Sequence, residues 1–546
     1  MAIKVLTALD VAKTQYYHFK AILIAGMGLF TDSYDLFCIS PVMKLIGRIY
    51  YDARDGNPGL TPPTVVSATV AIALLGTVIG QLVFGALGDR IGRRRVYGLS
   101  LLLMISSSIG CGFSICRTRK CVLTSLCFFR FLLGIGIGGD YPLSATIMSE
   151  FANKRTRGSF IAAVFSMQGF GILASSAVTM ALTAAFDRAT RQDDIGPLKT
   201  PEAADLAWRL ILMIGAIPAG LTFYWRMSMP ETPRYTALVE NDVIKATSDM
   251  GRVLGDFDLD TDIAEDSEAF RPPPPPPPPP SYGFFSRQFL IRHGRNLFAC
   301  SMAWFLVDIP YYSSTLFQSQ IYKPWFPPAN HLNAYEEAYN VAKFQAIIAV
   351  ASTLPGYFAS VYFIDRIGRR KIQMIGFFFM AVFLFALAGP YDKYWHDHTN
   401  AWFIILYALT FFFSNFGPNV ITFISPAELF PARFRSTCHG ISGAWGKVGA
   451  IIGSIGFLWA SQEKNQGKIE RGYEPGIGMM NALFILAGIC VIGLIHTYIF
   501  TPETKMRSLE ENESICGQNE SNEQLKSPSA DGSHLSSSPL YVHSPS

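Results

Sequence analysis

The chain has 546 residues, of which 50% are hydrophobic and 16% are charged, and its formal net charge is +4. Soluble proteins carry about 25% charged residues, so the composition excludes an ordinary soluble protein. The basic residues lie in short loops, which excludes an extended surface for a nucleic acid. Most of the nine cysteines lie inside apolar runs without the spacing of metal ligands, and we interpret them as small hydrophobic residues.

Long apolar runs separated by short polar segments predict an all-α integral membrane protein embedded in the lipid bilayer. The first run is not followed by a small-residue cleavage site, so we expect it to remain as a span. Twelve transmembrane helices in two pseudo-symmetric six-helix bundles are predicted, near residues 19–45, 66–87, 96–116, 122–149, 158–186, 207–228, 295–320, 341–364, 372–390, 401–425, 437–461 and 479–500. We divide the chain into an N-terminal bundle (1–228), a central cytoplasmic loop (229–294), a C-terminal bundle (295–506) and a cytoplasmic tail (507–546).

The central loop and the tail differ in composition from the spans. The loop contains an acidic run followed by uninterrupted proline from Pro272 to Pro280. Such a run favours a stiff extended helix of about 28 Å, which we interpret as a spacer. The alternative is a docking site for the aromatic-lined groove of a partner. The tail is rich in Ser, Glu and Asn, so we expect it to be disordered. These two segments are where trafficking or regulatory proteins are expected to bind.

Three motifs occur once in each half, in the same order and at nearly the same offset. They are the DRIGRR loops at 89–94 and 365–370 (offset 276), the Glu and Arg pairs at 150/157 and 428/435 (offset 278), and PET at 230–232 and 502–504 (offset 272). Each half has an even number of predicted spans, so the copies enter the membrane from the same side. The halves are therefore parallel repeats related by an axis along the membrane normal.

The distribution of Lys and Arg predicts the orientation. Four basic loops, at 90–95, 154–157, 366–371 and 433–435, fall on one side of the predicted spans. Cytoplasmic loops carry an excess of Lys and Arg, so we expect this side and both termini to be cytoplasmic. The basic loop at 117–120 falls on the other side, but four loops outweigh one.

Motifs near the first, fourth and tenth predicted spans carry a family resemblance. They are TDSYDLFCIS from Thr31, GGDYPLSATIMSE from Gly138, FGPN from Phe416 and SPAELFPARFRST from Ser425. With the repeated DRIGRR loop, they make the chain resemble the major facilitator superfamily and, within it, the plant and fungal proton-coupled inorganic phosphate transporters. The resemblance covers nearly the whole chain except the central loop and the tail, and the proline run departs from the family pattern. It implies a symporter that imports dihydrogen phosphate with protons by alternating access.

The predicted seventh span carries a polar stripe. Trp304, Asp308 and Tyr312 recur every four residues and share one helix face if Pro310 only bends the helix. A phosphate in a membrane needs hydrogen-bond donors, and the hydroxyl groups of dihydrogen phosphate need an acceptor. The resemblance assigns Asp308 to the phosphate hydroxyl, and Trp304 and Tyr312 to phosphate oxygens. An acceptor there rejects sulfate, which has no proton to donate near neutral pH. The alternative is a core stripe with a chance carboxylate.

Further polar residues in the spans complete the expected substrate site. Tyr141, Gln168 and Asn419 match substrate-contacting positions of the family, although each alone is also compatible with a helix-to-helix hydrogen bond. Lys447 lies inside the eleventh apolar run. We expect it to bind the anion and to pair with Asp308 when the site is empty, whereas the alternative is a lysine that reaches to the membrane surface.

Proton coupling is expected in the N-terminal half. Asp32 and Asp35 are three residues apart on one face of the first span, so they repel each other when both are ionised and one of them readily takes up a proton. Asp32 precedes Asp308 by the repeat offset of 276 residues. We therefore hypothesise that the N-terminal half carries the proton and the C-terminal half the phosphate, with Arg130 and Asp140 completing the relay.

Ionisable residues flank the cytoplasmic ends of the repeated spans, namely Asp89, Glu150, Arg157, Asp365, Glu428 and Arg435. We interpret Glu150 with Arg157, and Glu428 with Arg435, as gating salt bridges. They would hold the outward-facing state and break as the bundles rock. Static surface pairs are equally compatible with the sequence.

The sequence does not predict an enzyme, because it shows no nucleophile with a base and no metal cluster. The pattern GxGxxG at 134–139 lies within a membrane span, where it favours close helix packing rather than a dinucleotide. We expect no cofactor and no ATP-binding loop, and we expect a multi-pass protein of the plasma membrane. Arsenate, which is nearly isosteric with phosphate, should also enter. The alternatives are a sugar-proton symporter of the same superfamily and a membrane phosphate sensor.

Overall fold

The computed structural model describes residues 16–51, 58–114, 118–190, 200–240, 242–254, 282–316, 318, 331–395, 401–463 and 474–509. Every regular element in these ranges is helical. The acidic run, the proline run and the tail beyond residue 509 lie outside the described residues, so the predictions made for them stay predictions.

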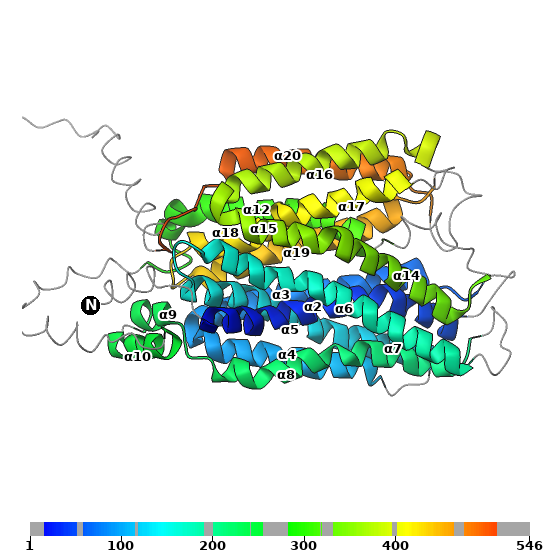
Figure 1. Cartoon of the computed structure of the whole chain (residues 1–546), viewed down its shortest axis with the longest axis horizontal. Helices are drawn as coiled ribbons and strands as arrows, with labels where there is room; N and C mark the ends of the chain where they lie inside the picture. Colours follow the sequence, from blue (N-terminus) through cyan, green and yellow to red (C-terminus); the bar gives the residue numbers. More distant parts are fainter. Residues whose placement is uncertain are drawn as a thin grey trace, which may run out of the picture.

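The first half forms six consecutive membrane helices that alternate in direction. They are α2 (Tyr16–Tyr50), α3 (Pro63–Ile91), α4 (Arg93–Gly112), α5 (Arg119–Phe151), α6 (Arg157–Thr190), and α7 (Ala203–Ile214) with α8 (Ala216–Ser228), which together form the sixth. Two short helices, α9 (Pro233–Leu238) and α10 (Val243–Leu254), follow at the end of the molecule where α2 begins (Figure 1).

The second half repeats this pattern. Its elements are α12 (Arg287–Leu316), α14 (Ala334–Ile348), η4 (Ala349–Thr353), α15 (Leu354–Ile367), α16 (Arg369–Ala388), η5 (Tyr391–Trp395), α17 (Ala401–Phe416), α18 (Pro418–Leu429), α19 (Arg435–Ala460) and α20 (Met479–Phe500). One span consists of α14, η4 and α15, and another consists of α17 and α18, which meet at Gly417.

Eleven helices among the described residues are long and apolar enough to cross a membrane. The remaining predicted span is α12, whose 30 residues extend over about 45 Å. Its hydropathy is lower because it carries three arginines near its start and Asp308 and three further polar residues in its second half. The predicted two-bundle helical membrane fold is confirmed.

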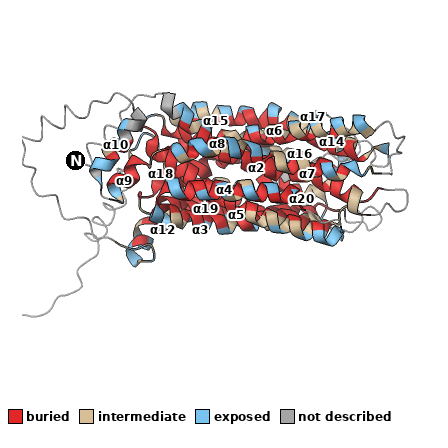
Figure 2. Ribbon diagram, turned by 90° about the horizontal axis from the view of Figure 1, so that it is seen from below, coloured by how far each residue is buried: buried red, intermediate tan, exposed pale blue. Residues whose placement is uncertain are grey.

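The two bundles lie side by side with their helices nearly parallel to the long axis of the molecule (Figure 1). They meet along α3 with α19 and along α6 with α14 and α15. Glycines allow the first of these approaches, because a Cβ at Gly440 of α19 would collide with the backbone of Gln81 in α3. Buried residues fill the interior between the helices, and intermediate and exposed ones follow the outer surface (Figure 2). Many of the exposed residues are large and apolar, such as Leu75, Leu102 and Ile485, as a lipid-facing surface requires.

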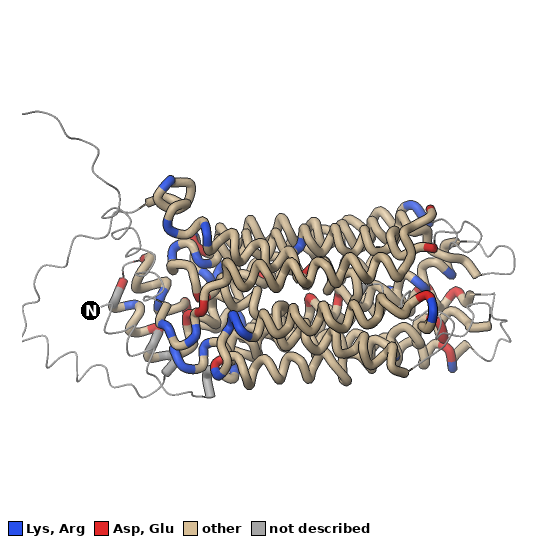
Figure 3. Tube along the Cα trace, turned by 90° about the horizontal axis from the view of Figure 1, so that it is seen from above, with Lys and Arg blue, Asp and Glu red and all other residues tan. Residues whose placement is uncertain are grey.

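Charged residues gather at the two ends of the molecule, and the end that carries α9 and α10 is the more basic one (Figure 3). The membrane-spanning middle is almost free of charge apart from a few positions in its interior. The more basic end is the side that the sequence predicts to be cytoplasmic, and this orientation stays a prediction.

The repeated DRIGRR loop has the same conformation in both halves. Gly92 and Gly368 have φ angles of 103° and 104°, in the left-handed region that favours glycine. Each glycine joins two helices directly, α3 to α4 and α15 to α16. Glu231 accepts hydrogen bonds from the first two backbone N–H groups of α4, and Glu503 does the same for α16. The PET motif of each half therefore caps the helix that follows the DRIGRR loop.

Among the described residues, six cysteines are free thiols within the apolar helices, namely Cys38, Cys111, Cys127, Cys300, Cys438 and Cys490. Cys121, near the start of α5, is disulfide-bonded, which the sequence reading did not predict. The start of α5 lies at the end of the molecule opposite α9 and α10.

Candidate functional site

The polar stripe of α12 faces Lys447 of α19. The helix continues through Pro310 to Leu316, so Trp304, Asp308 and Tyr312 do share one face. The Lys447 Nζ donates hydrogen bonds to Asp308 Oδ2 at 3.2 Å and to Tyr312 Oη at 2.6 Å. All these side chains are buried, so the ion pair is removed from water.

A second group of polar side chains crosses from one bundle to the other. Gln168 of α6 donates to Tyr141 Oη of α5 at 2.5 Å and accepts from Tyr357 Oη of α15 at 3.2 Å. Asn419 of α18 donates to Tyr357 Oη at 3.2 Å and to Asn415 Oδ1 at 2.8 Å. The sequence missed Tyr357. The internal repeat could have drawn attention to Tyr357. It stands eight residues before Asp365, and a polar residue, Gln81, stands eight residues before Asp89 in the other half.

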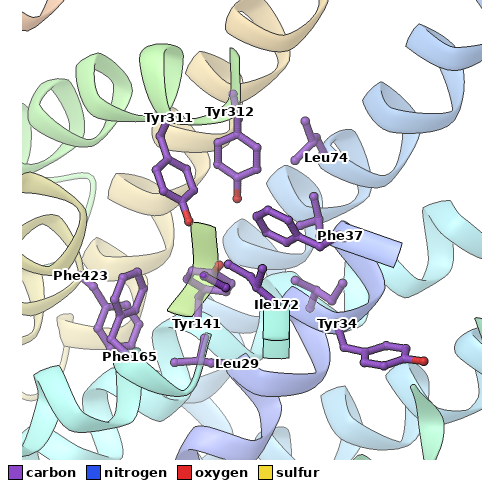
Figure 4. Packing of buried hydrophobic residues seen from close by; sticks show 14 of the residues in the cluster. Leu29, Tyr34, Phe37, Leu74, Tyr141, Phe165, Ile172, Tyr311, Tyr312 and Phe423 are labelled. Carbon is purple, nitrogen blue, oxygen red and sulfur yellow. The ribbon is translucent and has the colours of Figure 1, made fainter. Parts of the chain in front are cut away.

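Tyr141 joins the two groups. The Lys447 Nζ lies 5.0 Å from the centroid of the Tyr141 ring and 4.5 Å from that of Tyr312. The Trp304 ring lies 6.4 Å from the Tyr141 ring. Tyr311 and Tyr312 point their hydroxyl groups toward Tyr141 (Figure 4). The expected substrate residues therefore surround one interior region, which offers a cation, several N–H and O–H donors and the carboxylate of Asp308 as an acceptor.

The two acidic residues of α2 have different surroundings. Asp32 lies beside Tyr141 and within electrostatic range of Lys447, so it borders the same region as Asp308. Asp35 accepts a hydrogen bond from Ser108 Oγ at 3.4 Å. Arg130 lies close to Asp35, with its Nη1 3.5 Å from the Asp35 carbonyl oxygen.

Asp140 forms a salt bridge with a residue that the sequence missed. Its Oδ1 lies 2.5 Å from Nη1 of Arg226 in α8, and both side chains are fully buried. The Arg226 guanidinium also lies 3.7 Å from the centroid of the Tyr97 ring. Arg226 stands in the last turn of its helix, and no role was assigned to it from the sequence. Of the two residues expected to complete the proton relay, Arg130 thus lies near Asp35, whereas Asp140 pairs with Arg226.

A network of buried charges occupies the basic end of each bundle. Glu150 lies 3.2 Å from Arg93 Nη2 and accepts a hydrogen bond from Thr232 Oγ1 at 2.5 Å. Glu428 repeats this arrangement with Arg369 Nη2 at 2.7 Å and Thr504 Oγ1 at 2.5 Å. The two arginines belong to the repeated DRIGRR loops. This repetition could have identified them from the sequence.

The same end holds bonds between the bundles. Glu150 Oε1 lies 2.8 Å from Nη1 of Arg435 in α19, an ion pair that the sequence did not predict. The guanidinium of Arg157 donates to the carbonyl oxygen of Arg507 at 3.1 Å. The expected pairing of Glu150 with Arg157, and of Glu428 with Arg435, stays a prediction.

The aspartates of the repeated loops each bind the start of a helix in the opposite bundle. Asp89 accepts from the backbone N–H groups of Ser436 at 3.2 Å and Thr437 at 2.7 Å, at the start of α19. Asp365 accepts from the N–H of Ser159 at 2.8 Å, at the start of α6. Carboxylates stabilise helix N-termini. At the basic end, the two bundles are therefore joined by two symmetric helix caps in addition to the Glu150–Arg435 pair.

The opposite end is also bridged between the bundles. Glu337 of α14 lies 2.8 Å from Arg48 and 3.5 Å from Lys44 of α2. Asn333 donates to Asp187 Oδ1 of α6 at 2.7 Å. The sequence missed these contacts, because a charge near the end of a span looks like an ordinary loop residue. The site residues thus lie between two ends that are both closed.

The chain matches the family model described as sugar (and other) transporter over residues 21–515. It is 70% identical to a probable inorganic phosphate transporter of Oryza sativa subsp. japonica over 98% of both chains. It is 59% identical to a probable inorganic phosphate transporter of Arabidopsis thaliana, covering 94% of this chain and 96% of the relative.

Solved structures share the fold. A proton:xylose symporter of the major facilitator superfamily, solved with bound 6-bromo-6-deoxy-D-glucose, superposes with a TM-score of 0.69 at 19% identity, covering 91% of this chain and 99% of that one. An inward-open conformation of the xylose transporter from E. coli gives a TM-score of 0.61 at 18% identity, with 91% and 99% coverage. The chain therefore belongs to the major facilitator superfamily, within the group of plant inorganic phosphate transporters.

Proposed function

We propose that the protein is a secondary active symporter that imports dihydrogen phosphate together with protons by alternating access. The observation that carries the proposal is the buried Lys447, held between Asp308 and Tyr312 next to Tyr141. The names of the plant relatives support phosphate as the substrate.

The chemistry of the site fits the substrate. Phosphate competes for Lys447 and separates it from Asp308, which then accepts a hydrogen bond from a phosphate hydroxyl. Hydrogen-bond donors for the remaining phosphate oxygens come from Tyr312, Trp304, Tyr141, Gln168 and Asn419. Sulfate offers no hydroxyl and leaves the Asp308 carboxylate facing a second anion, which costs affinity.

Proton coupling is proposed for Asp32 and Asp35, with Asp140 and Arg130 assisting. One proton only cancels the charge of dihydrogen phosphate, so more than one proton must accompany each phosphate if the negative interior of a cell is to drive its entry. The position of Asp32 beside Tyr141 supports direct contact between the proton site and the phosphate site.

Alternating access requires that the two closed ends open in turn. We propose that Glu150, Arg157, Glu428, Arg435, Asp89 and Asp365 hold the basic end shut and that their bonds break when the bundles rock. The contacts of Asp89 and Asp365 with the opposite bundle support this role.

The protein is proposed to lie in the plasma membrane with both termini in the cytoplasm, and not to act as an enzyme. The basic end supports this orientation. The disulfide of Cys121 at the opposite end also supports it, because disulfides persist in an oxidising compartment. Arsenate is a proposed analogue substrate, and the central loop and tail are proposed to bind regulatory proteins.

The test is uptake of radiolabelled phosphate into proteoliposomes under an imposed proton gradient. Uptake that excess sulfate and xylose do not inhibit, and that Asp308→Asn abolishes, supports the proposal. Uptake of xylose in place of phosphate would favour a sugar symporter. A protein that inserts and binds phosphate without gradient-driven flux would favour a sensor.

A further inference from the structure

Gln81 of α3 is completely buried, and neither its Nε2 nor its Oε1 has a hydrogen-bond partner among the described residues. A carboxamide brings two donors and one acceptor, and their burial without partners costs free energy. Most buried polar groups in native proteins are satisfied, so such an exception requires an explanation.

Gln81 lies where α3 meets α5 and α19, at the edge of the candidate site. A Cβ placed on Gly443 of α19 would lie 2.7 Å from Gln81 Nε2 and 3.2 Å from its Oε1. A Cβ placed on Gly138 of α5 would lie 2.7 Å from the Gln81 backbone nitrogen. Gly443 stands about one helical turn before Lys447, and Gly138 about one turn before Tyr141. The Gln81 carboxamide thus lies next to the two helices that carry the cation and the joining tyrosine.

The internal repeat gives the same location independently. Gln81 stands eight residues before Asp89, and Tyr357 stands eight residues before Asp365. Gln81 and Tyr357 are therefore equivalent positions of the two halves. Tyr357 fully engages its hydroxyl between Gln168 and Asn419.

The partners of Tyr357 have equivalents as well. Asn419 stands nine residues before Glu428, as Tyr141 does before Glu150. Gln168 is equivalent to Gly446, because each stands eleven residues after the arginine of its repeat. By this symmetry, the positions equivalent to the two partners of Tyr357 are Tyr141 and Gly446. Gly446 has no side chain that could hydrogen-bond to Gln81. The glycine accounts for one of the two missing partners, and the structure shows no hydrogen bond between Gln81 and Tyr141.

We propose that Gln81 is a further phosphate-positioning residue, with Nε2 donating to a phosphate oxygen and Oε1 accepting from a phosphate hydroxyl. The inference rests on the proposed function. Dihydrogen phosphate satisfies both ends of the carboxamide at once, whereas sulfate satisfies only the donor. Gln81 would then add to the preference for phosphate from the N-terminal bundle, opposite Asp308 of the C-terminal bundle.

The test compares Gln81→Leu with the matched control Gln373→Leu. Gln373 of α16 is equally buried, and both ends of its carboxamide also lack partners. It lines a different cavity of about 10 Å³, bounded by α12, α16, α18 and residues 501 and 502, which suits one water molecule. The measurements are the KM for phosphate in proteoliposomes and the rise in Tm that phosphate produces in detergent.

We expect Gln81→Leu to raise the KM about tenfold and to reduce the phosphate-dependent rise in Tm, while the Tm without phosphate stays the same or increases. Gln373→Leu should keep both phosphate responses. If Gln81→Leu does not insert stably, Gln81→Met serves for the same comparison, because its unbranched side chain adapts to the space.

The outcomes separate this inference from the proposed function. A Gln81 variant that keeps the native KM and the native phosphate-dependent rise in Tm overturns the inference alone and assigns Gln81 a structural role. A native chain that shows neither phosphate uptake nor a phosphate-dependent rise in Tm overturns the proposed function, and the inference with it.

Discussion

Glu150 of the N-terminal bundle and Arg435 of the C-terminal bundle form a buried ion pair, with 2.8 Å between Oε1 and Nη1. The same carboxylate lies 3.2 Å from Arg93 of its own bundle, so it contacts two guanidinium groups at once. This ion pair joins the repeated Glu and Arg motifs across the molecule, and under the proposed alternating access it breaks when the basic end opens.

Glu150→Gln is therefore expected to increase the population of the state in which the basic end is open. The substitution keeps the shape of the side chain but removes the negative charge that Arg93 and Arg435 share, which destabilises the closed arrangement although Arg93 keeps its ion pair with Asp89.

Ser436 of α19 is fully buried against Gly88 of α3, so a cysteine introduced in its place serves as the reporter of this interface. The labelling of Ser436→Cys by a membrane-impermeant thiol reagent, applied from the basic side, should increase several-fold when Glu150→Gln is added. Glu240→Gln is the control for that experiment, because Glu240 pairs with Lys245 on the surface at 2.7 Å. Exposed ion pairs contribute little, so this substitution should leave the labelling of Ser436→Cys unchanged. Equal labelling of Ser436→Cys with and without Glu150→Gln would contradict a gating role for the pair.

Asp308 and Lys447 are expected to behave differently as single and double variants. Asp308→Asn or Lys447→Gln alone leaves one buried charge without its partner, which should cost about 3–5 kcal/mol of stability. The double variant removes both charges and should recover most of the lost Tm. Phosphate uptake should remain absent in all three, because the double variant still lacks both the cation and the acceptor. Recovery of uptake together with stability would show that the pair is only structural.

Asp32→Asn and Asp35→Asn are expected to separate proton coupling from phosphate binding. Neither substitution removes a phosphate ligand of the proposed site, so phosphate should still raise the Tm and exchange across the membrane. Accumulation driven by an imposed proton gradient should be lost, because an amide cannot carry the proton. Loss of phosphate binding with intact coupling would contradict the division of labour between the halves.

The contact of Glu337 with Arg48 and Lys44 predicts a phenotype at the opposite end. Glu337→Gln removes the charge that holds α14 to α2, so the state open to that side becomes more populated. We expect phosphate applied from that side to bind with an equal or lower KM, while the maximal uptake rate falls several-fold, because closure of this end precedes release on the other side. An unchanged uptake rate would mean that the contact does not control closure.

The sequence anticipated features that lie within a single helix or within the repeat. The stripe of Trp304, Asp308 and Tyr312 follows from the helical period, and it survives Pro310 because α12 continues through that residue. The spans follow from hydropathy, whereas the orientation inferred from the basic loops stays a prediction. The assignments of Tyr141, Gln168 and Asn419 depended on a family resemblance rather than on geometry, and their roles remain predictions.

Contacts between helices could not be read in this way. Hydropathy predicts that a segment crosses the membrane. It does not predict the rotation of that helix about its axis or its depth relative to its neighbours. Arg226 looked like a cation at the end of a span, yet the packing of α8 against α5 buries it on Asp140. Tyr357 looked like one aromatic residue in an apolar run, yet the approach of α15 to α6 makes it the link between Gln168 and Asn419.

The sequence by itself determined that this chain is a duplicated helical membrane protein with ionisable residues in its spans, because apolar runs, repeated motifs and helical periodicity are local properties. Only the tertiary structure decided which charges meet, from the pair of Lys447 with Asp308 to the pair of Glu150 with Arg435. A buried charge is tolerated only beside its partner, and the partner is set by how two separate helices pack against each other.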